Sequence, residues 1–443
     1  MYRHPPITTG ILVSVVILAL FGLLSLTGPA RADGWYTQTA PTTVNLTGVS
    51  FVSADEGWIC GGAGVILHTT DGGAHWVTQF SGTTLNLVDV SFANAQVGYV
   101  IGDSKIMLRT SNGGATWQMI DQPQQDYPWA QIQALDSQRV WRGGTVIEEP
   151  FTSGVIEWSG NGGASWSGYS MPCVPYPPHN VCNAGVTSIY VVNSQVAYFS
   201  AYRRWYDGSQ DNTMFRTSDG GTTWVELPPP QPGSPGMQFL NPTVGYATYG
   251  YVYKTTDAGN TWTMQPTSLM ATQVSFVDVT HGWSVGPDGD IGATSDGGTT
   301  WVQQASGTTQ TLNRVQFVDY SVGTAVGNQG TILHTISGGD PTGSVADPAH
   351  GSASRLLPPV PNPFSHQARI AYELSASAQV FLGVFDASGR LVRLLDEGSR
   401  AAGRHTISWN GKDASGIAVS RGVYFVRLNG AGVGGAQQVT IVR

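Results

Sequence analysis

Short stretches in which apolar and polar residues alternate run through most of the chain. The clearest are 273–277 (Gln-Val-Ser-Phe-Val), 282–286 (Gly-Trp-Ser-Val-Gly), 291–294 (Ile-Gly-Ala-Thr) and 301–304 (Trp-Val-Gln-Gln). Alternation with a period of two, bounded by Gly, Asp and Asn, is typical of half-buried strands joined by tight turns. The pattern therefore predicts four short strands in this stretch and an all-β fold.

The same unit recurs along the chain. The octet Thr-Ser-Asp-Gly-Gly-Thr-Thr-Trp occurs at 217–224 and 294–301, with degenerate copies at 69–76, 110–117, 159–166 and 255–262 and a decayed copy that begins at Thr335. An Asp or Asn side chain can accept a backbone N–H two residues on, and Gly-Gly permits the positive φ that a tight turn needs. These turn residues, for which we predict a structural role, are Asp71, Asn112, Asn161, Asp219, Asp257 and Asp296.

The spacing of the repeats predicts the blades of a propeller. The Trp residues that end the copies are separated by 41, 49, 58, 38 and 39 residues, close to the length of a four-stranded blade. The last unit has Thr342 where its outer-strand Trp should stand, whereas the segment that begins at Trp35 matches the one at Trp76. We therefore expect a seven-bladed β-propeller over residues 33–343, in which the N-terminal strand closes the last blade.

The octets carry a resemblance to a known group of proteins. The region resembles the Asp-box (BNR-type) β-propellers, and most closely the photosystem II assembly-factor-like proteins, whose units read Gly-Trp-x-x-Gly…Thr-x-Asp-Gly-Gly-x-Thr-Trp. That resemblance implies a propeller that binds a protein partner. The family is associated with a basic patch, whereas residues 33–345 contain 9 Lys and Arg against 23 Asp and Glu. An acidic ring does not favour nucleic acid or anionic lipid, and the photosynthetic role is not carried over.

The N-terminus and the cysteines indicate an exported protein. Residues 1–32 combine a weakly basic start, an apolar run over 11–26 and the sequence Ala30-Arg31-Ala32, which is typical of a cleaved signal peptide. The rival interpretation is an uncleaved membrane anchor, for which the run is short. In an oxidising compartment Cys173 and Cys182 are expected to form a local disulfide. Cys60 takes the place of Ile or Val in other repeats and is expected to be a buried apolar residue.

The C-terminal segment predicts a second domain. A Gly-, Ser- and Pro-rich linker is expected at 344–357 and a small Ig-like β-sandwich at 358–443, with strands at 370–374, 380–386, 391–395, 406–409, 423–428 and 438–442. The motifs Pro361-Asn362-Pro363-Phe364, Asp-Ala-Ser-Gly-Arg-Leu-Val and Gly-Val-Tyr-Phe-Val-Arg-Leu resemble the type IX secretion C-terminal sorting domain. They also resemble the Ig-like domain of flagellar hook-capping proteins. The sorting resemblance implies a partner in the secretion machinery and a location outside the cell or on the outer surface of a bacterium.

Four expanded segments predict a binding surface. Residues 122–131, 143–154, 168–185 and 203–212 exceed the repeat, and propeller topology brings all four to the face opposite the octet turns. Aromatic side chains mixed with charged ones are typical of recognition surfaces. The residues expected to bind a protein or polysaccharide are Tyr127, Trp129, Glu148, Glu149, Tyr176, His179, Arg203, Arg204, Trp205 and Tyr206.

Two other functions compete with binding. Glu148 and Glu149 could serve a carbohydrate-active hydrolase, although adjacent residues on an extended loop point apart and a retaining or inverting glycosidase needs two facing carboxyl groups. A purely structural surface protein is the other alternative. We predict no catalytic residue, cofactor or metal site, and a monomer. Asp288-Gly289-Asp290 is interpreted as a hairpin turn, and His68 and His334 as exposed strand residues.

Overall fold

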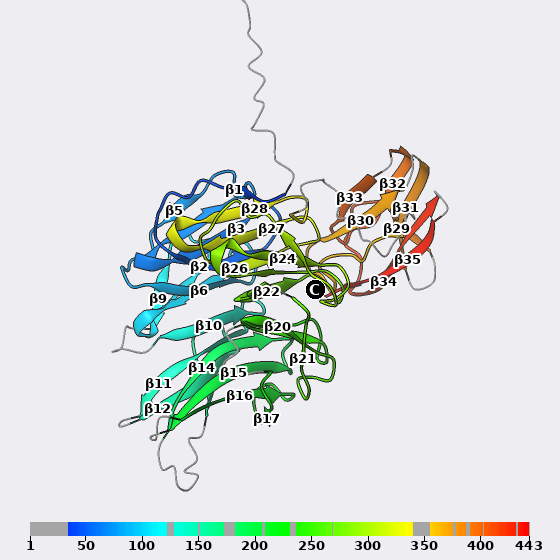
Figure 1. The fold of residues 1–443 in the computed structure, drawn as a ribbon. Coiled ribbons are helices and arrows are strands. Elements are labelled where there is room, and N and C mark those ends of the chain that lie inside the picture. Colours follow the sequence, from blue (N-terminus) through cyan, green and yellow to red (C-terminus); the bar gives the residue numbers. More distant parts are fainter. Residues whose placement is uncertain are drawn as a thin grey trace, which may run out of the picture. The chain divides into compact units, whose positions relative to one another are not determined.

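The structure is a computed structural model. It describes residues 34–121, 128–148, 151–171, 182–205, 209–230, 236–267, 269–339, 355–374, 378–386, 390–401, 403–430 and 433–442. In these residues the regular structure consists of strands and four short 3-10 turns (Figure 1). The all-β prediction is confirmed.

Between residues 36 and 335 the described residues form seven four-stranded antiparallel sheets, numbered 1 to 7 along the chain and listed from the inner to the outer strand. Sheet 1 consists of β2 (Leu46–Phe51), β3 (Gly57–Gly61), β4 (Ile66–Thr69) and β5 (Val77–Gln79). Sheet 2 consists of β6 (Leu87–Phe92), β7 (Gly98–Gly102), β8 (Met107–Thr110) and β9 (Gln118–Asp121). Sheet 3 consists of β10 (Trp129–Ala134), β11 (Val140–Glu148), β12 (Phe151–Ser159) and β13 (Ser167–Ser170).

Sheets 4 to 7 continue the same order of strands. They consist of β14 (Cys182–Val191), β15 (Ala197–Trp205), β16 (Gln210–Thr217) and β17 (Val225–Leu227); β18 (Gly236–Phe239), β19 (Gly245–Tyr249), β20 (Tyr251–Thr255) and β21 (Thr263–Met264); β22 (Gln273–Phe276), β23 (Gly282–Val285), β24 (Ile291–Thr294) and β25 (Val302–Gln304); and β26 (Leu312–Phe317), β27 (Gly323–Gly327), β28 (Ile332–Thr335) and β1 (Tyr36–Thr37). The outer strand of sheet 7 thus comes from the start of the described chain, with Tyr36 opposite His334.

The glycine that opens each Gly-Trp or Gly-Tyr motif makes room for an aromatic ring. A Cβ atom on Gly57 would lie 2.5 Å from the Phe51 ring on the paired inner strand, and one on Gly282 would lie 2.3 Å from the Phe276 ring. Four inner-strand Phe rings stack on an aromatic residue of the preceding sheet, namely Phe92, Phe239, Phe276 and Phe317, and Phe276 does so on Tyr246 at a centroid distance of 3.6 Å. The motif therefore builds the cores between neighbouring sheets.

In the described residues, polar side chains of the inner strands join six of the seven pairs of neighbouring sheets through backbone N–H groups, all but sheets 4 and 5. They accept the backbone N–H of the adjacent inner strand, in the pairs Ser50–Phe92 (3.0 Å), Ser91–Ala134 (2.9 Å), Gln133–Val191 (2.8 Å), Gln238–Phe276 (2.7 Å), Ser275–Phe317 (3.0 Å) and Gln316–Phe51 (2.7 Å). The last pair connects sheet 7 to sheet 1. The inner strands also contact one another in the cyclic order β2, β6, β10, β14, β18, β22, β26 and back to β2.

A second set of bonds links the outer strands to the octets. Gln79 accepts the indole N–H of Trp117 at 3.1 Å and donates to the Gly113 carbonyl at 2.9 Å, so the outer strand of sheet 1 holds the octet of sheet 2. Gln304 does the same for sheet 7, where it accepts the indole N–H of Trp35 at 2.8 Å. Trp35 therefore occupies the position of the octet Trp that the chain lacks near residue 342.

The C-terminal residues form two further sheets. One contains β29 (Arg355–Leu356), β30 (Ala368–Leu374) and β33 (Gly403–Trp409), and the other contains β32 (Leu391–Arg400), β31 (Ala378–Phe385), β34 (Gly422–Gly430) and β35 (Val433–Ile441). Both sheets contribute to one buried cluster that includes Tyr372, Trp409 and Val426. The expected linker at 344–357 reaches too far, because Arg355 and Leu356 already pair with β30.

Candidate binding surface

The octet turns use their acidic side chains to hold the backbone. Asp71 Oδ1 accepts the Thr69 hydroxyl at 2.9 Å and the backbone N–H of His75 at 2.9 Å. The same pair of bonds recurs at Asn112, Asn161, Asp219, Asp257 and Asp296. The accepted N–H lies four residues on rather than the expected two, because the Gly-Gly pair forms a longer turn. These side chains are engaged in the turns, in line with their predicted structural role.

The two ends of each sheet differ in what they carry. The octet turns join the third and fourth strands of a sheet, and the turns between the second and third strands lie at the other end. In sheets 1, 2, 6 and 7 the turn between the second and third strands is a short 3-10 turn. These turns are η1 (Gly62–Gly64), η2 (Asp103–Lys105), η3 (Pro287–Gly289) and η4 (Asn328–Gly330). We call the end with these turns the hairpin face. Asp288 of the Asp-Gly-Asp sequence lies in one of them.

Sheets 3 and 4 extend the hairpin face with long strands. The strands β11, β12 and β15 have nine residues each and β16 has eight, whereas β19 has five and β23 has four (Figure 1). At about 3.3 Å per residue, four extra residues project about 13 Å. The segments 143–154 and 203–212, expected from the sequence to be loops, are thus largely paired strands. Asn183 Oδ1 links the two sheets by accepting the Thr152 N–H at 3.0 Å.

The expectation that Trp129 is an exposed aromatic residue is wrong. Trp129 is only 2% exposed, and its indole N–H donates to the Lys105 carbonyl at 3.0 Å. The Arg142 guanidinium lies 4.1 Å from the Trp129 ring centre and 3.9 Å from that of Trp166, and it forms an ion pair with Glu157 at 2.6 Å. Trp129 begins the inner strand, so it packs between sheets instead of projecting from a loop.

The arginine pair Arg203 and Arg204 divides between two sides of β15. Arg203 is largely buried, pairs with Glu226 and lies over the Phe215 ring. Arg204 is exposed and points to the opposite side of the strand. Trp205 is half-buried at the end of β15. These three consecutive residues lie near the tip of sheet 4, with Arg203 and Trp205 on one side of β15 and Arg204 on the other.

Several predicted residues fall where the structure gives no description. Tyr127, Glu149, Tyr176, His179 and Tyr206 lie outside the described residues, as does Cys173, and only the backbone is described for Glu148 and Cys182. The acidic pair and the disulfide accordingly stay predictions. Cys60 is buried as predicted. His334, expected to be exposed, is 1% exposed and hydrogen-bonds Thr324 at 2.9 Å, because β1 covers it.

Sheet 5 carries an exposed aromatic group that the repeat pattern did not predict. Tyr249 and Tyr251 face each other across the β19–β20 turn and are 47% and 46% exposed. Met264, 55% exposed, lies opposite Tyr253 on the same side of the sheet. We call Tyr249, Tyr251 and Met264 the tyrosine shelf. The alternation Tyr-Gly-Tyr-Val-Tyr at 249–253 was the available signal.

Comparison with known proteins identifies the propeller. The family model described as "Photosynthesis system II assembly factor YCF48" matches residues 29–170, 78–212 and 263–347, which together make up more than half of the chain. The chain belongs to this family. The FlgD Ig-like domain model matches residues 362–432, which supports the Ig-like assignment of the C-terminal domain. No curated protein matches the sequence.

Solved structures agree on the fold of this YCF48-family chain. "YCF48 from Cyanidioschyzon merolae" is 20% identical with a TM-score of 0.54 and covers 68% of this chain and 99% of its own. "YCF48 bound to D1 peptide" is 18% identical with a TM-score of 0.53 and covers 69% and 97%. The WD40 β-propeller domain of Doa1 is 10% identical with a TM-score of 0.50 and covers 69% and 96%. At these identities the likeness establishes a β-propeller fold.

A cavity of about 210 Å³ lies among the inner strands. Its lining contains the side chains that join neighbouring sheets, among them Gln133, Gln238 and Gln316. Arg314 forms an ion pair with Asp89 at 3.4 Å, and burial raises the pKa of Asp89 despite that contact. The three glutamines thus form hydrogen bonds between neighbouring sheets, and Arg314 and Asp89 pair with each other.

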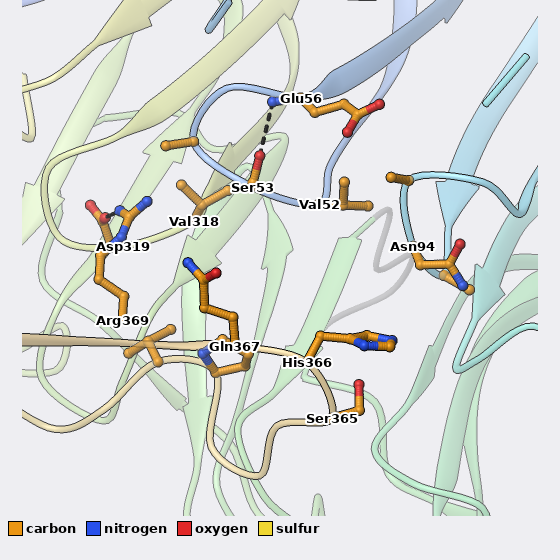
Figure 2. A pocket seen from close by; sticks show the side chains of 15 residues that line it. Val52, Ser53, Glu56, Asn94, Val318, Asp319, Ser365, His366, Gln367 and Arg369 are labelled. Carbon is orange, nitrogen blue, oxygen red and sulfur yellow. Dashed lines mark hydrogen bonds and ion pairs between the residues drawn. The ribbon is translucent and has the colours of Figure 1, made fainter. Parts of the chain in front are cut away.

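A larger pocket of about 600 Å³ is lined by turns of sheets 1, 2 and 7 together with residues of the C-terminal domain (Figure 2). Its charged side chains are already engaged: Arg369 with Asp319, and Glu56 with His68 at 3.4 Å. These ion pairs occupy the two carboxylates and the guanidinium group of the lining, which also contains His366 and Gln367. In the described part of the chain there is no cluster of three potential metal-binding side chains. No described helix has the length and hydrophobicity needed to span a bilayer.

Proposed function

We propose that this chain is a non-catalytic propeller that binds a protein partner through the hairpin face over sheets 3 and 4. Membership of the YCF48 family supports a protein ligand, since one YCF48 structure is described as bound to a D1 peptide. The location of the proposed binding surface is supported by the unequal lengths of the hairpins. Sheets 3 and 4 have long hairpins, whereas the equivalent turns elsewhere are short. Long segments on a rigid scaffold commonly carry binding function.

We also propose that the seven sheets form one closed ring of seven blades. The bond from Gln316 to Phe51 and the pairing of β1 with β28 support this arrangement, because each joins the end of the repeat to its beginning. A closed ring leaves the sheets without a free first or last member and gives the hairpins a rigid base.

The export of the chain is part of the same proposal. A signal peptide at 1–32 and a sorting role for the C-terminal domain would deliver the propeller to the outer surface of a bacterium or to the medium. The test is the N-terminal sequence of the protein recovered from the medium, which we expect to begin at Asp33, together with a variant that lacks residues 344–443. That variant should be retained in the periplasm, and its normal release would contradict the sorting role.

The binding proposal can be tested by shortening the hairpins. Thr145 pairs directly with Gly154, and Tyr202 with Asn212, so an Asn-Gly turn can replace residues 146–153 or 203–211 and close the shorter hairpin. The probe is a phage-displayed library of random dodecapeptides selected on the full chain. We expect the enriched peptides to lose affinity for one or both trimmed chains. Equal binding to the intact and trimmed chains would overturn this location.

A further inference from the structure

We propose that the tyrosine shelf and Arg204 together form the seat of the partner, and that they take an extended peptide with aliphatic or proline residues next to an acidic side chain. This inference deepens the proposed protein-binding function and rests on it. Within the hairpin face, it assigns the contact to the side of the long sheet 4 hairpin that faces sheet 5.

The register of sheet 5 fixes the direction of the shelf. Ala247 lies opposite Tyr253, and Tyr249 lies opposite Tyr251, so these residues share one side of the sheet. Ala247 belongs to the apolar cluster that also contains Tyr198 and Met214 of sheet 4. The shelf therefore points toward sheet 4, above the buried contact between the two sheets.

The register of sheet 4 places Arg204 on the opposing side. Tyr198 stacks on Phe239 of sheet 5 at 3.6 Å, so this side of β15 faces sheet 5. Side chains alternate along a strand, and Tyr202 and Arg204 consequently lie on the same side as Tyr198. The second strand of sheet 5 ends at Tyr249, whereas β15 runs on to Trp205. The tyrosine shelf on sheet 5 therefore lies lower than the end of β15 on sheet 4, and we call this difference in height the step.

The chemistry of the step indicates its occupant. Exposed tyrosine rings offer flat apolar area with a polar edge, and such surfaces recognise extended and proline-rich peptides. In the described residues Arg204 is an exposed cation for which no ion pair is found, unlike Arg203 beside it. Because acids outnumber bases in the propeller 23 to 9, an exposed cation at this position favours a partner that carries a carboxylate there.

The test combines the dodecapeptide library with point variants of the full chain. A synthetic peptide from the selection is titrated against Tyr249→Ser/Tyr251→Ser, against Arg204→Gln, and against the control Val77→Ser/Phe80→Ser. The control removes apolar side chains that are 65% and 89% exposed on sheet 1. We expect at least about a tenfold loss of affinity for the double tyrosine variant and none for the control. For Arg204→Gln we expect about a threefold loss and a weaker dependence on salt.

Each other result has a stated meaning, provided that the variants keep the melting temperature of the parent chain. If the selected peptides bind the double tyrosine variant as tightly as the parent, the tyrosine shelf is not the contact site. The proposal that the chain binds a protein is then unaffected. A selection that yields no peptide would overturn both. Binding of a soluble β-glucan that is lost in the double tyrosine variant would overturn the peptide as occupant.

Discussion

Gln316 on the inner strand of sheet 7 forms two hydrogen bonds with the backbone of Phe51 on the inner strand of sheet 1. Its Oε1 accepts the Phe51 N–H at 2.7 Å, and its Nε2 donates to the Phe51 carbonyl at 3.2 Å. The two residues are separated by 265 positions in the chain. We therefore expect the stability of the first sheet to depend on the last.

The first prediction follows from that pair. Gln316→Leu removes both bonds and leaves two backbone groups unpaired, so the free energy of unfolding should fall by about 2 kcal/mol. Urea denaturation measures the change. Gln303→Leu, an exposed glutamine on the outer strand of sheet 6, is the control and should change stability little. Equal effects of the two variants would mean that the Gln316 contact is not significant.

Trp35 should act as a core residue despite its place near the N-terminus. It is buried in the cluster shared by sheets 6 and 7, edge-on to Phe317, and is bonded to Gln304. Trp35→Ala should lower the free energy of unfolding by about 3–5 kcal/mol. The measurement is urea denaturation followed by the fluorescence of the remaining tryptophans. A loss below about 1 kcal/mol would contradict the pairing of this segment with sheet 7.

Two octet tryptophans should respond differently to the loss of their indole N–H. Trp117 donates to Gln79, whereas the buried Nε1 of Trp262 finds no acceptor among the described residues, because Leu227 occupies the position of that glutamine. Trp117→Phe should cost about 1–2 kcal/mol more than Trp262→Phe. Thermal unfolding of both variants gives the comparison. If Trp262→Phe proves the more damaging, the assignment of Gln79 as the essential acceptor fails.

The octet aspartates should make the protein sensitive to acid. Hydrogen bonds from Thr223 lower the pKa of Asp219 to about 2, and those from Thr261 lower the pKa of Asp257. A folded-state pKa below the unfolded value of about 3.9 gives stability that is complete above that value and is lost as the pH falls toward the folded pKa. Stability should therefore decline between about pH 4 and pH 2.

Asparagine occupies the same position at Asn112 and Asn161, so the double variant Asp219→Asn/Asp257→Asn should fold. Its free energy of unfolding should depend less on pH over that window than that of the parent chain. Urea denaturation at a series of acidic pH values tests this. An unchanged slope would show that these two carboxylates do not contribute to the acid sensitivity.

Trp129 should matter for stability rather than for binding. It is buried against Arg142 and hydrogen-bonded to Lys105, so Trp129→Ala should lower the free energy of unfolding by about 3–5 kcal/mol. Urea denaturation measures this, and the affinity of the folded variant for a selected peptide should match that of the parent. A stable variant with weakened binding would reverse this assignment.

The sequence by itself determined the features that depend on neighbouring positions. The octet turns at Asp71 and its equivalents close through bonds that span four residues, and the alternation over 273–304 predicts β22 to β25 to within one residue. It also identified Cys60 as buried and predicted the six main strands of the C-terminal domain, from β30 to β35. Local turn chemistry and side-chain alternation suffice for these features because their partners lie nearby in the chain.

Only the tertiary structure decided which side chains are buried and which meet. Trp129 is covered by Lys105 and Arg142 from other strands, and His334 is covered by a segment about 300 residues away. The register of β19 and β20 sets the side of sheet 5 that carries the tyrosine shelf, and the register of β15 sets the side that carries Arg204. A one-residue change in register would turn each of these side chains to the other side of its sheet. Contacts between distant strands fix that choice.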